Sequence, residues 1–127
     1  MTGLRNPLAL ASGLGSARDG THHWWLQRLT AIALALLSPW FVFFMVSHRG
    51  NGYVQMHVAL ADPINASLMV CFVLAMLWHA RLGLQVIVED YVHVRWVEVA
   101  LQVTIRFAYT LAAVLSVLAI ARIALSS

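Results

Sequence analysis

One charge-free apolar run decides the fold: residues 63–80, PINASLMVCFVLAMLWHA, which continue past Arg81 and Gln85 to Val88. An α-helix rises about 1.5 Å per residue, so a run of this length crosses the roughly 30 Å hydrocarbon core of a bilayer. The run lacks the period-two alternation of a membrane strand, and a barrel would need many more segments. We therefore expect a membrane-spanning helix.

Two further runs have the same character, at residues 29–48 and 107–121. With its flanks, each reaches the roughly 20 residues that span a bilayer. The prediction is an all-α membrane protein with three transmembrane helices in a single domain, residues 1–127. Its expected parts are a tail at 1–22 and helices at about 26–47, 63–88 and 97–124.

The composition excludes a soluble domain, because 61% of residues are hydrophobic, only 10% are charged and the mean hydropathy is +0.80. A soluble domain of this size has too much surface to carry so few charges. All eight basic residues are arginine and the net charge is +3. On so apolar a chain, this charge indicates topology signals and contact with anionic membrane lipids, not nucleic acid.

Local signals predict how the helices begin, bend and end. Asp62 is a suitable N-cap, and Pro63 suits the first helical position. Pro39 should bend the first helix near residues 35–39. The glycine-containing stretch at 49–52 should end it.

Arginines set the expected orientation, because cytoplasmic loops carry an excess of positive charge. Arg5, Arg18 and Arg28 precede the first helix, and Arg95 lies in the second connection on the same side. Arg49 and Arg122 lie on the other side. The bias favours an internal N-terminus and an external C-terminus.

His79 is the leading candidate for chemistry. A histidine within a membrane helix is costly and is usually a metal or haem ligand or a proton-carrying group. Gly83, within about 40° of it at ~100° per residue, leaves a depression that a second helix or a planar ring could approach. A single histidine cannot supply both axial ligands of a six-coordinate haem, so a second would come from another subunit or copy. The alternative is a buried histidine hydrogen-bonded to a neighbouring helix.

Two polar groups lie toward the membrane surface. His22 and Arg28 could contact carboxylates such as haem propionates, although Arg28 could equally be a topology signal. The Asp90–Tyr91 pair ends the second apolar run, about 18 Å along the helix from His79. A phenol there can donate a hydrogen bond to a quinone carbonyl. The alternative is an ordinary interfacial tyrosine.

A polar stripe opens the third helix, with a spacing of three, four and four residues. Its members are Arg95, Glu98, Gln102 and Arg106. The stripe favours contact with another protein, and the alternative is an interfacial turn whose arginine reaches toward the headgroups.

Together these residues resemble the small membrane-anchor subunit of succinate dehydrogenase, respiratory complex II, in its alphaproteobacterial and mitochondrial branch. The family pattern of a histidine, a glycine four residues on and a closing Asp-Tyr is matched by His79, Gly83, Asp90 and Tyr91. A second element is matched by His22, Arg28 and the Thr-Ala-Ile at 30–32. The likeness covers roughly residues 20–95 by motif. Arg81 departs from members with an aromatic residue there, and we expect it to affect a subunit contact rather than ligation.

The resemblance implies specific roles. His79 would be one axial ligand of haem b, and a larger cytochrome b anchor subunit would complete the transmembrane bundle and supply the other. Tyr91, with Asp90 beside it, would bind ubiquinone, and His22 and Arg28 would contact the haem propionates. A flavoprotein subunit would oxidise succinate and an iron–sulfur subunit would carry the electrons to the quinone.

The same resemblance implies a place in the cell and the limits of the chain's own activity. The subunit would cross the bacterial inner membrane, N-terminus cytoplasmic and C-terminus periplasmic, or the equivalent mitochondrial membrane. It would serve the tricarboxylic acid cycle and respiratory chain without complete catalytic activity alone. Three alternatives stay open: the anchor of a fumarate reductase, a cytochrome b subunit of another respiratory dehydrogenase, and a haem-free scaffold.

Overall fold

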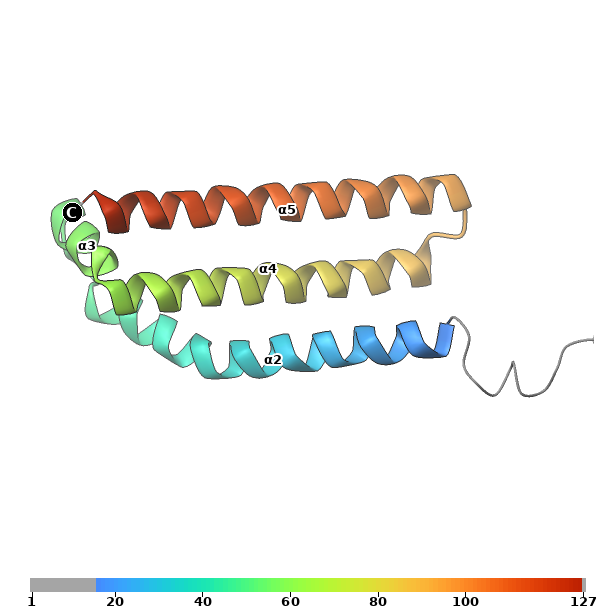
Figure 1. Cartoon of the computed structure of the whole chain (residues 1–127), viewed down its shortest axis with the longest axis horizontal. Helices are drawn as coiled ribbons and strands as arrows, with labels where there is room; N and C mark the ends of the chain where they lie inside the picture. Colours follow the sequence, from blue (N-terminus) through green and yellow to red (C-terminus); the bar gives the residue numbers. More distant parts are fainter. Residues whose placement is uncertain (1–15, 127) are drawn as a thin grey trace, which may run out of the picture.

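The structure, a computed structural model, describes the backbone of residues 16–126 and the side chains of residues 21–126. It contains four helices over that range, α2 (Ser16–Ser47), α3 (Tyr53–Ala61), α4 (Pro63–Tyr91) and α5 (Arg95–Leu125), and no strand (Figure 1). Three segments are long and apolar enough to cross a membrane: Thr21–Ser47, Pro63–Tyr91 and Arg95–Leu125. The predicted all-α membrane fold with three spanning helices is confirmed.

The long helices form a row with α4 in the middle. α4 packs against α2 on one side and α5 on the other, and no backbone contact joins α2 to α5 among the described residues. In Figure 1 the start of α2, the end of α4 and the start of α5 lie at one end, and α3 lies at the other. This arrangement brings the predicted sites near residues 22–28 and 90–91 to the same end of the molecule.

Helix α4 begins at a cap that the sequence predicts. The Asp62 side chain accepts hydrogen bonds from the backbone N–H groups of Ile64, at 3.0 Å, and Asn65, at 3.2 Å. Pro63 occupies the first turn, where a missing N–H costs nothing. After α2, Gly50 takes a positive φ of 88°, which a residue without Cβ adopts readily. Both predicted helix boundaries are confirmed.

Helix α2 changes direction in its teal part in Figure 1, and Pro39 lies inside the helix. Proline cannot donate a hydrogen bond to the carbonyl four residues earlier, which is that of Ala35. Beyond the proline, Phe41 stacks on Phe72 of α4, with ring centroids 4.4 Å apart and planes 9° apart. The aromatic pair packs the last third of α2 against α4 beyond the bend.

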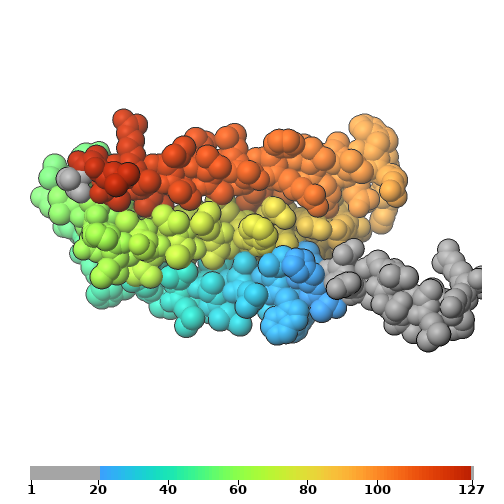
Figure 2. Space-filling view, in the orientation of Figure 1, coloured from blue at the N-terminus to red at the C-terminus, as the bar shows by residue number. Residues whose placement is uncertain are grey.

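The shared core is thin. The buried apolar side chains among the described residues are Phe44, Ala66, Phe72, Leu82, Val88 and Ile120. Many large apolar side chains, such as Leu36 at 74% and Phe107 at 74%, are exposed. Figure 2 shows α2, α4 and α5 as three bands whose outer surfaces are uncovered along their length. Surfaces of this composition need lipid or other membrane helices around them.

Two features of the fold differ from the expected boundaries. The connection at 48–62 contains the nine-residue helix α3, which is too short to cross a bilayer and carries no apolar run of spanning length. Helix α2 begins at Ser16, within the expected tail at 1–22, because hydropathy marks the spanning part of a helix and not its polar extension. The remainder of that tail, residues 1–15, lies outside the described range.

Candidate functional site

His79 lies on the side of α4 that faces α2. It lines a hollow of about 310 Å³ whose other walls come from α2. These lining residues are Trp24, Gln27, Arg28 and Ala31. Their spacing of three, one and three places them on one face of the helix. The structure thus brings two of the predicted site residues, His79 and Arg28, into one hollow.

Thr30 fixes the orientation of the His79 ring. Its Oγ1 is 3.0 Å from Nδ1 of His79, 2.9 Å from the Leu26 carbonyl oxygen and 3.0 Å from the Gln27 carbonyl oxygen. In the tautomer of His79 that carries its hydrogen on Nδ1, the Thr30 oxygen accepts from the ring and the hydroxyl hydrogen goes to one of the two carbonyl oxygens. In this tautomer Nε2 of His79 keeps its lone pair, which is the form that binds a metal.

This contact is compatible with both interpretations of His79 that the sequence leaves open, a ligand and a histidine hydrogen-bonded to a neighbouring helix. The histidine is hydrogen-bonded to a neighbouring helix, as the structural alternative requires. The hydrogen bond uses only one ring nitrogen. The other nitrogen remains available as a ligand, and a hydrogen bond at Nδ1 is the usual way in which a ligating histidine is oriented.

Arg28 supplies the positive charge of the hollow. Its guanidinium carbon lies 5.4 Å from the centre of the Trp24 ring, within range of a cation–π contact. The side chain is exposed, so its donors remain available to a carboxylate. His22 is also exposed but does not line the hollow, and it lies about 9 Å farther along α2 by ~1.5 Å per residue.

Asp90 and Tyr91 are the last residues of α4, and both are exposed, Tyr91 at 79%. The helix runs without interruption from His79 to Tyr91, so the two are about 18 Å apart along its axis. They are separate sites on one helix. At ~100° per residue, Asp90 shares the His79 side of α4, while Tyr91 lies about 120° away.

Gly83 lies one turn from His79, toward Tyr91. A Cβ placed on this residue would meet no atom within 4 Å in the described part of the chain. The space beside it is therefore open, as expected for a depression that something outside the chain could fill. The glycine is not required by packing against α2 or α5.

The polar stripe of α5 is divided between two environments. The side-chain amide of Gln102 donates to the Gln85 carbonyl oxygen of α4 at 3.4 Å, and Gln85 in turn donates to Glu89 at 3.0 Å. Gln102 thus contacts α4 of the same chain, a contact that the sequence did not predict, while the expected contact of the stripe with another protein stays a prediction. The contact arises from the antiparallel register of α4 and α5, which the spacing along one helix does not specify. Arg95 and Arg106 are exposed.

Sequence reasoning missed part of the hollow. The sequence did not predict Trp24 or Gln27 as part of the site, and it marked Thr30 and Ala31 only as parts of the Thr-Ala-Ile motif, without the contact between Thr30 and His79. Helical spacing could have predicted the other lining residues, because residues 24, 27 and 31 lie on the same helical face as Arg28, the residue expected to contact a propionate. No such signal exists for Thr30, whose partner is 49 positions away.

The fold and this hollow define the class: a small all-α membrane protein whose spanning helices bury little surface against one another. Comparison with known proteins adds the family. A family profile described as the succinate dehydrogenase/fumarate reductase transmembrane subunit matches residues 2–121. The chain therefore belongs to this family of transmembrane subunits, and the resemblance found in the sequence is confirmed.

Individual relatives agree with that assignment. The succinate dehydrogenase hydrophobic membrane anchor subunit of Rickettsia bellii is 40% identical over 88 residues, covering 69% of this chain and 70% of that protein. The subunit of the same name from Rickettsia conorii is 41% identical over 83 residues, covering 65% and 66%. That from Paracoccus denitrificans is 32% identical over 85 residues, covering 67% and 66%. Each alignment spans roughly two thirds of the relative.

Proposed function

We propose that the chain is the hydrophobic anchor subunit of a succinate:ubiquinone oxidoreductase and that it helps to bind haem b and ubiquinone. One observation carries the haem part of the proposal: His79 and Arg28 line a single hollow between α2 and α4, and Thr30 is hydrogen-bonded to His79. A lone-pair nitrogen and a cation beside the same hollow match the iron and the carboxylates of one haem.

His79 would be an axial ligand through Nε2. Among the described side chains, no group of three His, Cys, Asp or Glu could hold a metal ion. Haem requires no such cluster, because its porphyrin supplies four nitrogens and the protein adds only axial ligands. The second axial ligand would come from the larger cytochrome b anchor subunit, across the open side of the hollow.

Thr30 and Arg28 would assist His79 in different ways. Thr30 would accept a hydrogen bond from Nδ1–H and so favour the tautomer whose Nε2 can bind the iron. Arg28 would pair with a haem propionate through its planar donor fork, and His22 would reach a propionate from farther along α2. Bound in this position, haem b supplies a one-electron redox centre within the membrane.

Tyr91 and Asp90 would form part of the ubiquinone site at the end of α4. The exposed Tyr91 hydroxyl can donate a hydrogen bond to a quinone carbonyl and hold the head group at the membrane surface. The neighbouring Asp90 carboxylate can orient the tyrosine or help deliver the protons that quinone reduction consumes. Membrane lipid around the helices would give the quinone tail its path to the site.

The remaining redox centres of the complex would lie in other subunits. A flavoprotein subunit would oxidise succinate and an iron–sulfur subunit would pass the electrons to the quinone near Tyr91. These subunits would dock at the end of the row that holds Tyr91 and Arg28. By the arginine bias, that end faces the cytoplasm, or the matrix in a mitochondrion.

Isolation of the intact complex tests this function. The chain is tagged at its C-terminus, the complex is purified in mild detergent, and the copurifying chains are identified by mass spectrometry. We expect a flavoprotein, an iron–sulfur protein and a second membrane subunit, together with a reduced b-type absorption band and succinate-dependent quinone reduction. A fumarate-reducing complex, another dehydrogenase or a haem-free assembly would contradict the proposal.

A further inference from the structure

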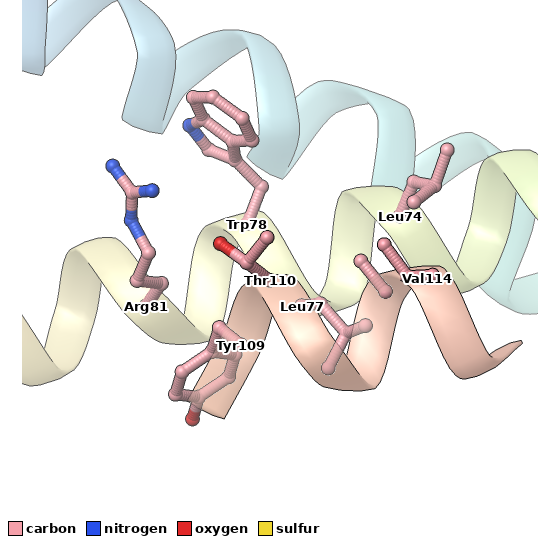
Figure 3. Close-up of a pocket in the computed structure, with 8 residues that line it drawn as sticks. Leu74, Leu77, Trp78, Arg81, Tyr109, Thr110 and Val114 are labelled. Atoms are coloured by element: carbon pink, nitrogen blue, oxygen red, sulfur yellow. The ribbon is translucent and has the colours of Figure 1, made fainter. Parts of the chain in front are cut away.

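A second polar group lies within the membrane span, on the opposite side of α4 from His79. Arg81 is about 200° from His79 at ~100° per residue. It lines a groove of about 290 Å³ between α4 and α5, together with Trp78 of α4 and Tyr109 and Thr110 of α5 (Figure 3). Nothing in the proposed function uses this groove.

The Arg81 guanidinium has no acceptor within the described part of the chain. Its Nε atom is buried and forms no hydrogen bond. The guanidinium carbon lies 4.8 Å from the centre of the Trp78 ring, and Figure 3 shows both side chains leaving α4 in the same direction. A cation–π contact compensates only part of the cost of removing an arginine from water. None of the residues that line the groove is acidic, so the balancing negative charge has to come from outside the chain.

The depth of Arg81 decides what can carry that charge. Arg81 lies ten residues before Tyr91, which is about 15 Å along α4 from the membrane surface. An arginine side chain can extend several ångströms toward the headgroups, which covers only part of this depth. Lipid phosphates stay at the surface, so an anion that meets Arg81 has to be held inside the membrane by a protein segment.

The shape of the groove fits a segment that crosses the membrane. A second hollow of about 300 Å³ shares Leu74, Ala113 and Val114 with the first and extends along α5 to Val117 and Leu118. Leu118 lies about 34 Å along α5 from its start, so the combined groove runs through the bilayer centre into the opposite half. Ala113 lines both hollows, and a small side chain at such a position lets a neighbouring helix approach closely.

We propose that a spanning helix of the second membrane subunit lies in the α4–α5 groove and pairs an aspartate or glutamate with Arg81. The inference rests on the proposed function for the presence of that subunit. A carboxylate matches the planar guanidinium through two parallel hydrogen bonds. The apolar face of the same helix would cover the continuation of the groove to Leu118, whereas a lipid chain or a quinone tail would fill it and leave Arg81 unpaired.

This contact requires the second membrane subunit to meet the row on two sides. Its haem ligand would approach α4 from the side of His79, and its carboxylate would approach from the side of Arg81, about 200° away. Two different helices of that subunit would therefore flank α4.

Photo-crosslinking in the intact complex tests the occupant of the groove. The crosslinker p-benzoylphenylalanine is placed at Val114, which is 50% exposed and lines both hollows. After irradiation, mass spectrometry should identify a spanning segment of the second membrane subunit that contains an aspartate or glutamate. Leu115 is the control position, because it is 58% exposed and lines neither hollow, and it should not yield this segment. A crosslink only to lipid, to another copy of this chain or to a segment without an acidic residue overturns the proposal.

A charge exchange tests the ion pair itself. Arg81→Glu sets two carboxylates against each other, so recovery of the second membrane subunit with the tagged chain should fall more than about tenfold. Arg122→Glu changes the charge equally at an exposed position near the end of α5 and should keep that subunit. Replacing the crosslinked acidic residue with arginine should restore recovery of the subunit in the Arg81→Glu background. Failure of the exchange to restore it overturns the ion pair, including where Arg81→Glu alone does not assemble.

The two tests distinguish this contact from the proposed function. A crosslinked acidic segment and a working charge exchange in a complex without haem would support the contact and contradict haem binding. A haem-containing, quinone-reducing complex in which Val114 crosslinks only to lipid would leave the proposed function in place and overturn the contact.

Discussion

His79 on α4 and Thr30 on α2 are joined by a hydrogen bond of 3.0 Å between Nδ1 and Oγ1, across the interface of two membrane-spanning helices. The threonine hydroxyl also lies within hydrogen-bond distance of the Leu26 and Gln27 carbonyl oxygens of its own helix, so in the Nδ1–H tautomer its oxygen accepts from the histidine. One contact thus sets the rotation of the imidazole and its position relative to Arg28.

Replacing His79 with alanine should remove or alter the b-type haem spectrum of the complex, because the substitution deletes the proposed axial nitrogen. The measurement is the reduced-minus-oxidised absorption spectrum together with haem content per complex. His57→Ala is the control, since His57 lies on α3 at the other end of the row and should leave the spectrum unchanged. An unchanged spectrum and haem content in His79→Ala would exclude this ligand.

Thr30→Val should weaken haem retention while keeping the shape of the side chain. The valine cannot accept from Nδ1–H, and loss of such a supporting hydrogen bond typically lowers metal-site affinity by about 10–100-fold. The rate of haem transfer from the complex to excess apomyoglobin measures the effect. Thr30→Ser keeps the hydroxyl and should behave like wild type. Equal transfer rates for the valine and serine variants would show that the hydrogen bond does not support ligation.

Substitutions at Gly83 distinguish contacts within this chain from contacts with a haem or a partner subunit. Gly83→Ala should leave assembly intact or slightly stabilise α4, since alanine is favoured over glycine in a helix by about 1 kcal/mol and its Cβ meets no atom of the described chain. Gly83→Leu should reduce haem content, because a longer side chain would fill the depression beside His79. Normal haem content in the leucine variant would mean that neither the haem nor a partner helix approaches Gly83.

Tyr91→Phe should lower succinate-to-quinone activity while succinate oxidation with a soluble artificial acceptor stays normal. The change deletes one hydroxyl, and a lost hydrogen bond to a neutral acceptor costs about 0.5–1.5 kcal/mol, or roughly two- to tenfold in rate, with more if the quinone is also mispositioned. Tyr53→Phe is a matched control, since Tyr53 is equally exposed, at 82%, but begins α3 at the other end of the row. A parallel fall in both activities would make Tyr91 structural.

Reporter fusions should place the two termini on opposite sides of the membrane. A fusion before Met1 is expected to report an internal location and one after Ser127 an external location, because the arginine excess lies at the Tyr91 end. An enzymatic reporter that is active only outside the cytoplasm, paired with one that is active only inside, gives the assignment. The reverse pattern would put Tyr91 on the outer face and separate it from a cytoplasmic or matrix dehydrogenase.

Sequence alone predicts the parts of this molecule that depend on one segment at a time. The apolar runs define the spanning helices, Asp62 and Pro63 define the start of α4, and Pro39 defines a bend in α2. Helical phase places Gly83 beside His79 and Arg81 opposite it. Each of these follows from local geometry and from the cost of polar groups in hydrocarbon.

Features that depend on how two helices meet could not be predicted in the same way. The contact between Thr30 and His79 requires the rotation and vertical register of α2 against α4. Gln102 and Gln85 likewise meet only because α5 and α4 pack in one particular antiparallel register. Any threonine or glutamine in an apolar helix could form a hydrogen bond of this kind. Which residue is its partner is therefore known only from the packed structure.

Because α4 separates α2 from α5, these two helices are not in direct contact among the described residues, and both pack against α4. A substitution on α2 can therefore affect one on α5 only through α4. Helix α4 must fit both neighbours. A rotation that improved its fit to α5 would turn His79 away from Thr30, so the residues tolerated along α4 are those that satisfy both neighbours at once.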